Sequence, residues 1–119
     1  MNKKKTISVV MPVFNEGSGL GRFYDKLKVV LDKLSYDFEL VFVNDGSTDN
    51  SIDVLTSLRG GDKRIRIVEL SRNFGHQNAV ISGLDQASGE AVVLMDVDFE
   101  DNPEYILSFV DHWEKGYQV

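Results

Sequence analysis

The sequence predicts an α/β fold with a parallel, doubly wound sheet of the Rossmann-like type. Three observations support this prediction. Apolar residues switch repeatedly between a strand-like and a helix-like period, the connections between these segments are short, and the first strand segment is almost wholly apolar. Alternating strands and helices favour right-handed crossovers, which place successive strands parallel and bury them on both faces. The 119 residues suffice for one such domain, over residues 1–119.

The composition sets limits on function. The chain is 42% hydrophobic and 27% charged, as an ordinary globular domain is. Its formal net charge of −6 argues against a general nucleic-acid surface. The absence of cysteine excludes disulfides and cysteine-ligated metals, and it fits a reducing cytoplasm. No apolar run reaches the roughly 20 residues of a transmembrane helix.

The first half of the chain contains two predicted strands, each followed by a helix. A β-rich apolar segment over residues 6–14 predicts the first strand, and residues 38–44 predict the second. Between them, apolar residues at three- and four-residue intervals predict an amphipathic helix that buries Leu20, Phe23, Leu27, Leu31 and Leu34. The stretch DGSTDNS then supplies helix-capping residues, Ser47 among them, before a short helix that buries Ile52, Leu55 and Leu58.

The third and fourth predicted strands repeat this arrangement. Residues 64–71 alternate in polarity and residues 90–96 are mostly apolar, so both read as strands. The helix between them, over residues 76–87, is expected to bury one face that carries Val80, Leu84 and Ala87.

The end of the sequence predicts one more helix and the start of another strand. Asn102 and Pro103 are typical of a helix start, and this helix is expected to bury Ile106, Phe109, Val110 and Trp113. Residues 116–119 resemble the beginning of a fifth strand that is cut short. We therefore expect exposed apolar surface at the edge of the sheet and a tendency to form homo-oligomers.

Polar residues gather where each predicted strand ends. They are Asn15-Glu16, Asn44-Asp45, Ser71-Arg72-Asn73 and Asp96-Val97-Asp98. In doubly wound sheets, ligands bind outside the carboxyl ends of the strands, which all lie along one rim. The sequence therefore predicts a binding site at this rim.

The acidic stretch that follows the fourth strand predicts a cation site. Asp96, Asp98 and Glu100 alternate, so an extended backbone would point all three to one side. Carboxylate oxygens are the ligands that magnesium and manganese prefer. The alternative is a solvated acidic turn before a helix, and we favour it for Asp101, Asn102 and Glu104.

Other motifs are incomplete. GSGLGR lacks the third glycine of a dinucleotide fingerprint, because Arg22 stands at that position. Ser47 does not lie in a nucleophile elbow and is expected to cap a helix. His76 and His112 have no cysteine or nearby histidine partner, which argues against zinc.

Four segments together resemble a known family. MPVFNE, VNDGSTDNS, SRNFGHQ and DVDFEDNPE, in this order and spacing, are similar to the family-two glycosyltransferases of GT-A fold. The branch they resemble most includes dolichol-phosphate mannosyltransferase and bacterial undecaprenyl-phosphate sugar transferases. The resemblance covers essentially the whole chain. It implies that residues 1–119 are the nucleotide-binding half of a GT-A fold, truncated in the fifth strand.

The resemblance also implies roles for residues on the first two strands. Pro12, Phe14 and Glu16 would line the pocket for the base and the ribose, with Phe14 in place of the usual tyrosine. Asn44 and Asp45 stand where the family usually has two aspartates that hold the base. The loss of the first carboxylate bears on which base is preferred.

Further roles fall on the third and fourth strands. Arg72 and Asn73 would approach the nucleotide, and Asp96 would contact the nucleotide sugar. Asp98 would bind a divalent cation, Mg²⁺ or Mn²⁺, and Glu100 replaces a glutamine on the metal side. The resemblance assigns no catalytic base.

The implied reaction is the transfer of a hexose, with inversion, from a nucleotide-diphosphate sugar to a polyprenyl phosphate. It would take place in the cytoplasm or at the cytoplasmic face of the membrane of the cell envelope. Two alternatives stay open. The chain could belong to a glycosyltransferase that acts on a polysaccharide or another acceptor, or to a module that binds nucleotide or cation without turnover.

Overall fold

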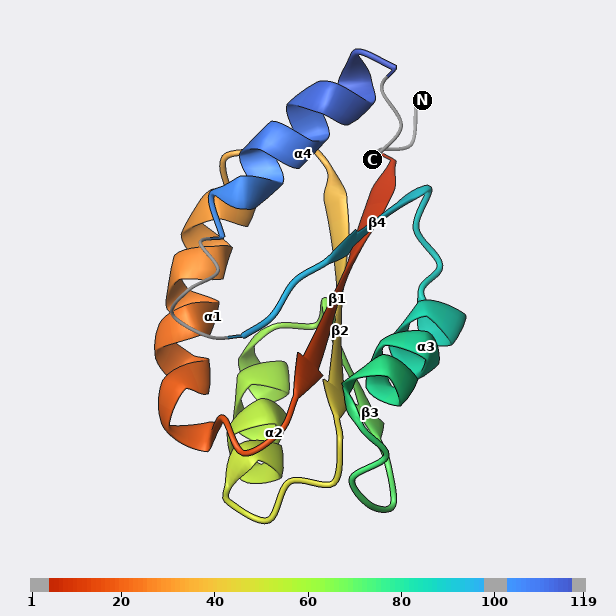
Figure 1. Cartoon of the computed structure of the whole chain (residues 1–119). Helices are drawn as coiled ribbons and strands as arrows, with labels where there is room; N and C mark the ends of the chain where they lie inside the picture. The colour runs from red at the N-terminus through yellow and green to blue at the C-terminus, as the bar shows by residue number, and fades with distance from the viewer. Residues whose placement is uncertain (1–4, 98–102, 117–119) are drawn as a thin grey trace.

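Four parallel strands form the centre of the protein (Figure 1). In the computed structural model, which describes residues 5–97 and 103–116, the sheet has the order β3-β2-β1-β4. The strands are β1 (Thr6–Val13), β2 (Asp37–Asn44), β3 (Ile65–Glu69) and β4 (Ala91–Leu94). Every neighbouring pair is parallel, with register partners such as Val9↔Leu40 and Val9↔Val93. The predicted parallel α/β fold is therefore confirmed.

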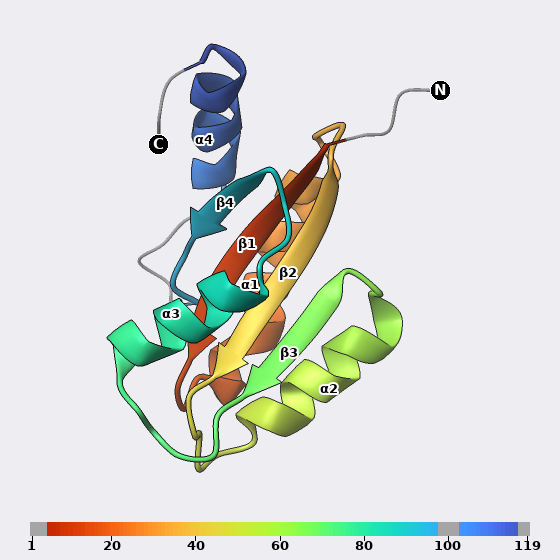
Figure 2. The same ribbon diagram turned by 90° about the vertical axis from the view of Figure 1, so that its right-hand side faces the viewer.

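Helices cover both faces of this sheet, as a doubly wound fold requires (Figures 1 and 2). They are α1 (Gly17–Leu31), α2 (Ser51–Gly61), α3 (His76–Gln86) and α4 (Tyr105–Glu114). Side chains from α1, α2 and α4 join one apolar core, and α3 packs on the opposite face against a smaller cluster. Alternate residues of β1 point to the two clusters, so Val9 joins the first and Val10 the second.

The start of α4 differs slightly from the prediction. The helix begins at Tyr105, two residues after Pro103. At its start, the N–H groups of Ile106 and Leu107 donate to the carbonyls of Pro103 and Glu104, three residues back, at 3.0 and 2.9 Å, which marks a tight first turn. Asn102, the predicted N-cap, lies outside the described residues.

The predicted buried face of α3 is wrong at Leu84, whereas Ala87 does pack against the cluster on this face and Val80 is partly buried. Ala79 and Gly83 are its buried residues, whereas Leu84 is 44% exposed. A Cβ added to Gly83 would lie 2.4 Å from Cγ1 of Val10 and 2.9 Å from Cγ2 of Val43. The helix therefore approaches the sheet through its small residues, and this closeness leaves no room for the larger apolar side chains.

A polar cluster closes the amino end of the sheet, opposite the rim. Ser8 is fully buried in β1, and its hydroxyl donates to Oε1 of Glu39 at 2.8 Å. Ser88 donates to the same carboxylate through its backbone N–H (2.9 Å) and its hydroxyl (3.0 Å), and Arg66 pairs with it at 3.0 Å. Burial acts to raise the pKa of Glu39, but these hydrogen bonds outweigh it and hold the pKa below its ordinary value.

A groove of about 550 Å³ runs between β4 and α4. It is lined by Val92, Val93, Leu94, Tyr105, Ser108, Phe109 and His112. Leu94 is 47% exposed and Tyr105 is 67% exposed, so apolar surface is present here, as predicted. Homo-oligomer formation stays a prediction. Within residues 5–97 and 103–116, no helix is long and apolar enough to cross a membrane.

Candidate functional site

The sheet divides at its carboxyl end, between β1 and β4. β1 pairs with β2 as far as Val13↔Asn44 but with β4 only as far as Val10↔Leu94. Directly after β4, the N–H of Met95 donates to the carbonyl of Val10 at 3.0 Å. The chain leaves β1 toward β2 and later returns on the other side of β1 as β4, and ligands bind at such a switch point.

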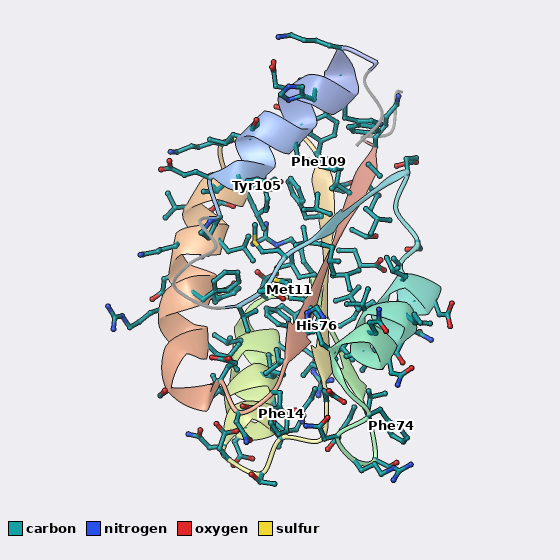
Figure 3. The ribbon with its side chains drawn as sticks, in the orientation of Figure 1. Met11, Phe14, Phe74, His76, Tyr105 and Phe109 are labelled. Atoms are coloured by element: carbon teal, nitrogen blue, oxygen red, sulfur yellow. The ribbon has the colours of Figure 1, made fainter. Side chains whose placement is uncertain are left out.

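The predicted site residues at the end of β1 lie on this rim. Pro12 is buried in the strand opposite Val43, beyond the last β1–β4 pair, so its missing N–H leaves no β4 partner unmatched. Phe14 follows the strand and is 42% exposed, and Figure 3 shows it at the same end of the molecule as Phe74. Glu16 is half-buried, and its N–H donates to the hydroxyl of Ser51 at 3.1 Å.

The end of β2 places two polar side chains deep in the rim. Asn44 is 2% exposed and Asp45 is 4% exposed. Oδ1 of Asn44 accepts the N–H of Ser47 at 3.3 Å, and Oδ1 of Asp45 accepts the N–H of Phe74 at 2.8 Å. The carboxylate of Asp45 therefore joins the loop after β2 to the loop after β3.

The loop after β3 packs closely on the loop after β2. Gly46 has φ +67°, and an added Cβ would lie 2.3 Å from the carbonyl carbon of Arg72 and 2.3 Å from the nitrogen of Asn73. The guanidinium of Arg72 stacks over the Phe74 ring at 4.6 Å, and Oδ1 of Asn73 accepts the N–H of Gly75 at 2.9 Å. Both predicted residues are exposed on the rim.

The sequence did not predict that His76 belongs to this site. Its Nε2 lies 3.0 Å from Oδ1 of Asp96, the predicted sugar-contacting residue at the end of β4. The two residues lie 20 positions apart, and each keeps about half of its side chain or more exposed. His76 thus connects the loop after β3 to the end of β4. Its position at the start of α3, directly after the polar SRNFG stretch, was the only available signal.

The loops after β1 and β2 are also joined. Oδ1 of Asn15 accepts the N–H groups of Thr48 at 2.8 Å and Asp49 at 3.3 Å. In return, Oγ of Ser47 accepts the N–H of Asn15 at 3.0 Å, and Oδ2 of Asp49 accepts the N–H of Gly17 at 3.0 Å. The expectation that Ser47 caps a helix is therefore wrong, because α2 begins at Ser51 and the Ser47 hydroxyl holds the first loop instead.

The predicted metal ligands, Asp98 and Glu100, lie outside the described residues. Among residues 5–97 and 103–116, no group of three histidine, aspartate or glutamate side chains could hold a metal ion. The described chain does bring the carboxylate of Asp96 to the rim at the end of β4. The acidic stretch as a whole offers only oxygen donors, and this donor set suits a hard divalent cation.

The rim and the β4–α4 groove are different places. The residues that line the groove include none of those predicted to bind a nucleotide, and none carries a carboxylate, lysine or arginine side chain. The polar residues and the contacts between loops are concentrated on the rim. We therefore assign the candidate site to the rim.

Known proteins are similar to this chain in sequence. Residues 8–119 match the family described as Glycosyl transferase family 2. An uncharacterized glycosyltransferase, YkcC, from Bacillus subtilis is 44% identical over 119 residues, which are 100% of this chain and 37% of that protein. Undecaprenyl-phosphate 4-deoxy-4-formamido-L-arabinose transferase from Yersinia pestis is 35% identical, over 97% of this chain and 36% of that protein.

A solved structure of a glycosyltransferase has a similar fold. Glucosyl-3-phosphoglycerate synthase from Mycobacterium tuberculosis, in complex with Mn²⁺, uridine diphosphate and phosphoglyceric acid, superposes with a TM-score of 0.74 at 26% identity. The match covers 97% of this chain and 41% of that one. The chain thus spans little more than a third of the curated relatives it matches, and corresponds to their amino-terminal, GT-A-type part. Because the family match extends over nearly all of its residues, the chain belongs to glycosyl transferase family 2.

Proposed function

We propose that the full-length protein transfers a hexose from a nucleotide-diphosphate sugar to a polyprenyl phosphate, and that this rim binds the donor. Family membership supports a sugar-transfer reaction. The undecaprenyl-phosphate sugar transferase of Yersinia pestis supports the acceptor class, and the uridine diphosphate of the Mycobacterium tuberculosis synthase supports the donor class. Residues 1–119 supply the donor-binding region in this proposal.

The observation that carries the proposal is that four loops are joined side by side along the rim. Asn15 connects the loop after β1 to the loop after β2, and Asp45 connects that loop to the loop after β3. The contact between His76 and Asp96 extends the connection to β4. Residues that lie far apart in the sequence thus form one continuous polar surface at the switch point of the sheet.

The rim residues suit the parts of a nucleotide diphosphate. The exposed ring of Phe14 offers a stacking surface for a base, and the buried carboxylate of Asp45 offers an acceptor for a base N–H. The exposed guanidinium of Arg72 can pair with phosphate oxygens. Four more residues at the strand ends and in the loops that follow them complete the proposed nucleotide pocket: Pro12, Glu16, Asn44 and Asn73.

A divalent cation, Mg²⁺ or Mn²⁺, completes the proposed site. Asp98 and Glu100 would hold it, and Asp96 would contact the nucleotide sugar beside it. When bound, such an ion neutralises the charge that develops on a leaving diphosphate. The Mn²⁺ in the Mycobacterium tuberculosis synthase supports this choice of ion.

In the proposed reaction, an acceptor phosphate oxygen attacks the anomeric carbon from the face opposite the nucleotide. The new carbon–oxygen bond forms as the bond to the diphosphate breaks, and the diphosphate leaves with the electron pair, so the anomeric centre inverts. A phosphate monoester has its second pKa near 6 and is largely a dianion at neutral pH. The acceptor therefore needs no strong general base. A polyprenyl acceptor would place the reaction at the cytoplasmic face of the membrane.

The test is a transfer assay on the full-length protein in detergent or vesicles. Undecaprenyl phosphate, Mn²⁺ and either a UDP-hexose or a GDP-hexose labelled in the sugar are incubated with the protein, and the lipid is extracted. We expect label in the lipid fraction, as a glycosyl phosphate of inverted configuration. Label in a water-soluble polymer would point to a polysaccharide acceptor, and nucleotide binding without any transfer would point to a non-catalytic module.

A further inference from the structure

We propose that Asn15 is a positioning residue that holds the loop after β2 in the shape needed to bind the donor nucleotide. This inference rests on the proposed function. Asn15 was not among the residues predicted to contact the nucleotide. Its side chain accepts hydrogen bonds from the neighbouring loop, so its effect on the donor would pass through Thr48 and Asp49.

The backbone of Asn15 has an unusual conformation. Its φ is +53°, and among the described residues it is the only non-glycine residue with positive φ. Side chains disfavour this region, although asparagine tolerates it better than most residues do. The conformation turns the chain directly after Phe14 and directs the carboxamide toward the loop that follows Asp45.

The contacts fix the orientation of the carboxamide. Both main partners of its oxygen are backbone N–H groups, those of Thr48 and Asp49, so Oδ1 and not Nδ2 must face them. The Thr48 hydroxyl lies 3.4 Å from the same oxygen, and Oγ of Ser47 accepts the N–H of Asn15. Side chain and backbone of one residue therefore hold three consecutive residues of the neighbouring loop.

Asn15 does not belong to the apolar core. Its side chain is exposed, so it buries little apolar area, and its partners lie between the ends of the strands and α2. Phe14 directly precedes Asn15, and Asp45 precedes the loop residues that Asn15 binds. Both are proposed to bind the base. Loss of the link would thus change the geometry of the nucleotide pocket more than the stability of the fold.

Two substitutions separate the carboxamide from the backbone conformation. Asn15→Gly keeps the positive φ but removes the acceptor oxygen, whereas Asn15→Asp keeps both. Ser88→Ala is the matched control, because Ser88 is also an exposed loop residue with a side-chain hydrogen bond but lies at the amino end of the sheet. The four full-length proteins are titrated calorimetrically with uridine diphosphate and with guanosine diphosphate, each in the presence of Mn²⁺.

We expect Asn15→Gly to bind the preferred nucleotide about three- to tenfold more weakly, the factor that corresponds to the net loss of about one hydrogen bond. Asn15→Asp and Ser88→Ala should remain within about twofold of the wild type. Amide hydrogen exchange should quicken at Thr48 and Asp49 in Asn15→Gly and stay unchanged in β1 and β2. This local readout identifies the link even if the variant is less stable overall.

The possible failures are distinguishable. If the wild type binds neither nucleotide, the proposed function and this inference are both overturned. If the wild type binds and Asn15→Gly binds equally well, only the role of Asn15 is overturned. Equal weakening in Asn15→Gly and Ser88→Ala, or exchange that quickens throughout the sheet, would mean that Asn15 acts through general stability and would also overturn its positioning role.

Discussion

The carboxylate of Asp45 accepts a hydrogen bond from the backbone N–H of Phe74, 29 positions away, at 2.8 Å. Asp45 is 4% exposed, so this bond is partly buried, and it ties the end of β2 to the loop after β3. One oxygen of the carboxylate thus has a structural task. In the proposed function, the same side chain also faces the donor base.

These two tasks can be separated by substitution. Asp45→Asn retains an acceptor oxygen for the Phe74 N–H, so we expect little loss of stability but weaker nucleotide binding. Asp45→Ala leaves that N–H unpaired, which costs about 1–3 kcal/mol in the free energy of unfolding. Urea denaturation measures the stability, and calorimetric titration with a nucleoside diphosphate measures the binding. Equal stability of both variants would show that the bond from the Phe74 N–H contributes nothing to the free energy of unfolding.

The metal prediction concerns the acidic stretch after β4. Nucleoside diphosphate and Mn²⁺ should each bind more tightly in the presence of the other, because a metal that bridges protein and phosphate couples the two equilibria. Asp98→Asn should largely abolish this coupling in the full-length protein. Asp101→Asn, a change at an expected helix start, is the control and should leave the coupling in place. Calorimetric titrations with and without Mn²⁺ check both statements, and equal nucleotide affinity under the two conditions in the wild type would refute them.

A second polar cluster predicts how stability depends on pH. Tyr24 of α1 donates to Oδ2 of Asp62 at 2.5 Å, and Arg64 binds the same carboxylate through Nε and Nη2, at 2.9 and 2.7 Å. The hydrogen bonds from Arg64 are the main cause that lowers the pKa of Asp62 from 3.8 to about 2. Burial, and then the contact with Asp62, raises the pKa of Tyr24 from 10.0 to about 12.

The sign of the effect follows from the lowered pKa of Asp62. Its contribution to stability is present above pH 3.8, where the carboxylate is charged in the folded and unfolded states. It is lost as the pH falls toward 2. The loss is about 2 kcal/mol, since one pKa unit corresponds to about 1.4 kcal/mol. Asp62→Asn should be less stable at pH 5 and should approach the wild type near pH 2, whereas the exposed-residue control Asp25→Asn should follow the wild type throughout. Urea denaturation at several pH values checks this.

The close approach of α3 to the sheet predicts opposite effects for two helical glycines. Gly83→Ala should destabilise the protein by about 1–3 kcal/mol, because its Cβ would overlap Val10 and Val43. Gly21→Ala in α1, where nothing lies within 4 Å, should instead stabilise it by up to about 1 kcal/mol through helix propensity. Thermal denaturation of the two variants is the measurement, and similar shifts of the midpoint in the same direction would contradict the packing described here.

The sequence was sufficient to predict the fold and the location of the rim, because both follow from local apolar periodicity. Strands such as β2 are continuous apolar runs, and in a parallel sheet their polar ends must share one edge. The buried face of α3 could not be predicted in this way. Hydrophobicity favours Leu84 over Gly83, whereas the structure selects the small residue because the helix lies too close to Val10 for a larger one.

The contacts between loops could not be predicted either. Asn15 and Thr48, or His76 and Asp96, meet only after the strands between them have been placed side by side, and neither pair has a characteristic spacing in the sequence. Ser47 shows the difficulty well, because its residue type suits a helix cap as much as it suits the loop contact that it makes. The assignments of Asp98 and Glu100 rest on the acidic pattern and on the family resemblance, because both residues lie outside the described part of the chain.

The central place of β1 has a consequence for the order in which the protein folds. β1 is synthesised before the other three strands of the sheet, yet its partner on one side, β4, begins only at Ala91. One side of this buried strand therefore stays without its native neighbour until residues 91–94 have left the ribosome. Pairings between such distant segments form slowly, because the chain loses the entropy of closing a long loop before any stabilising contact forms. During that interval the nascent chain exposes a strand that can associate with other chains, so chaperones that shield apolar segments should favour correct folding.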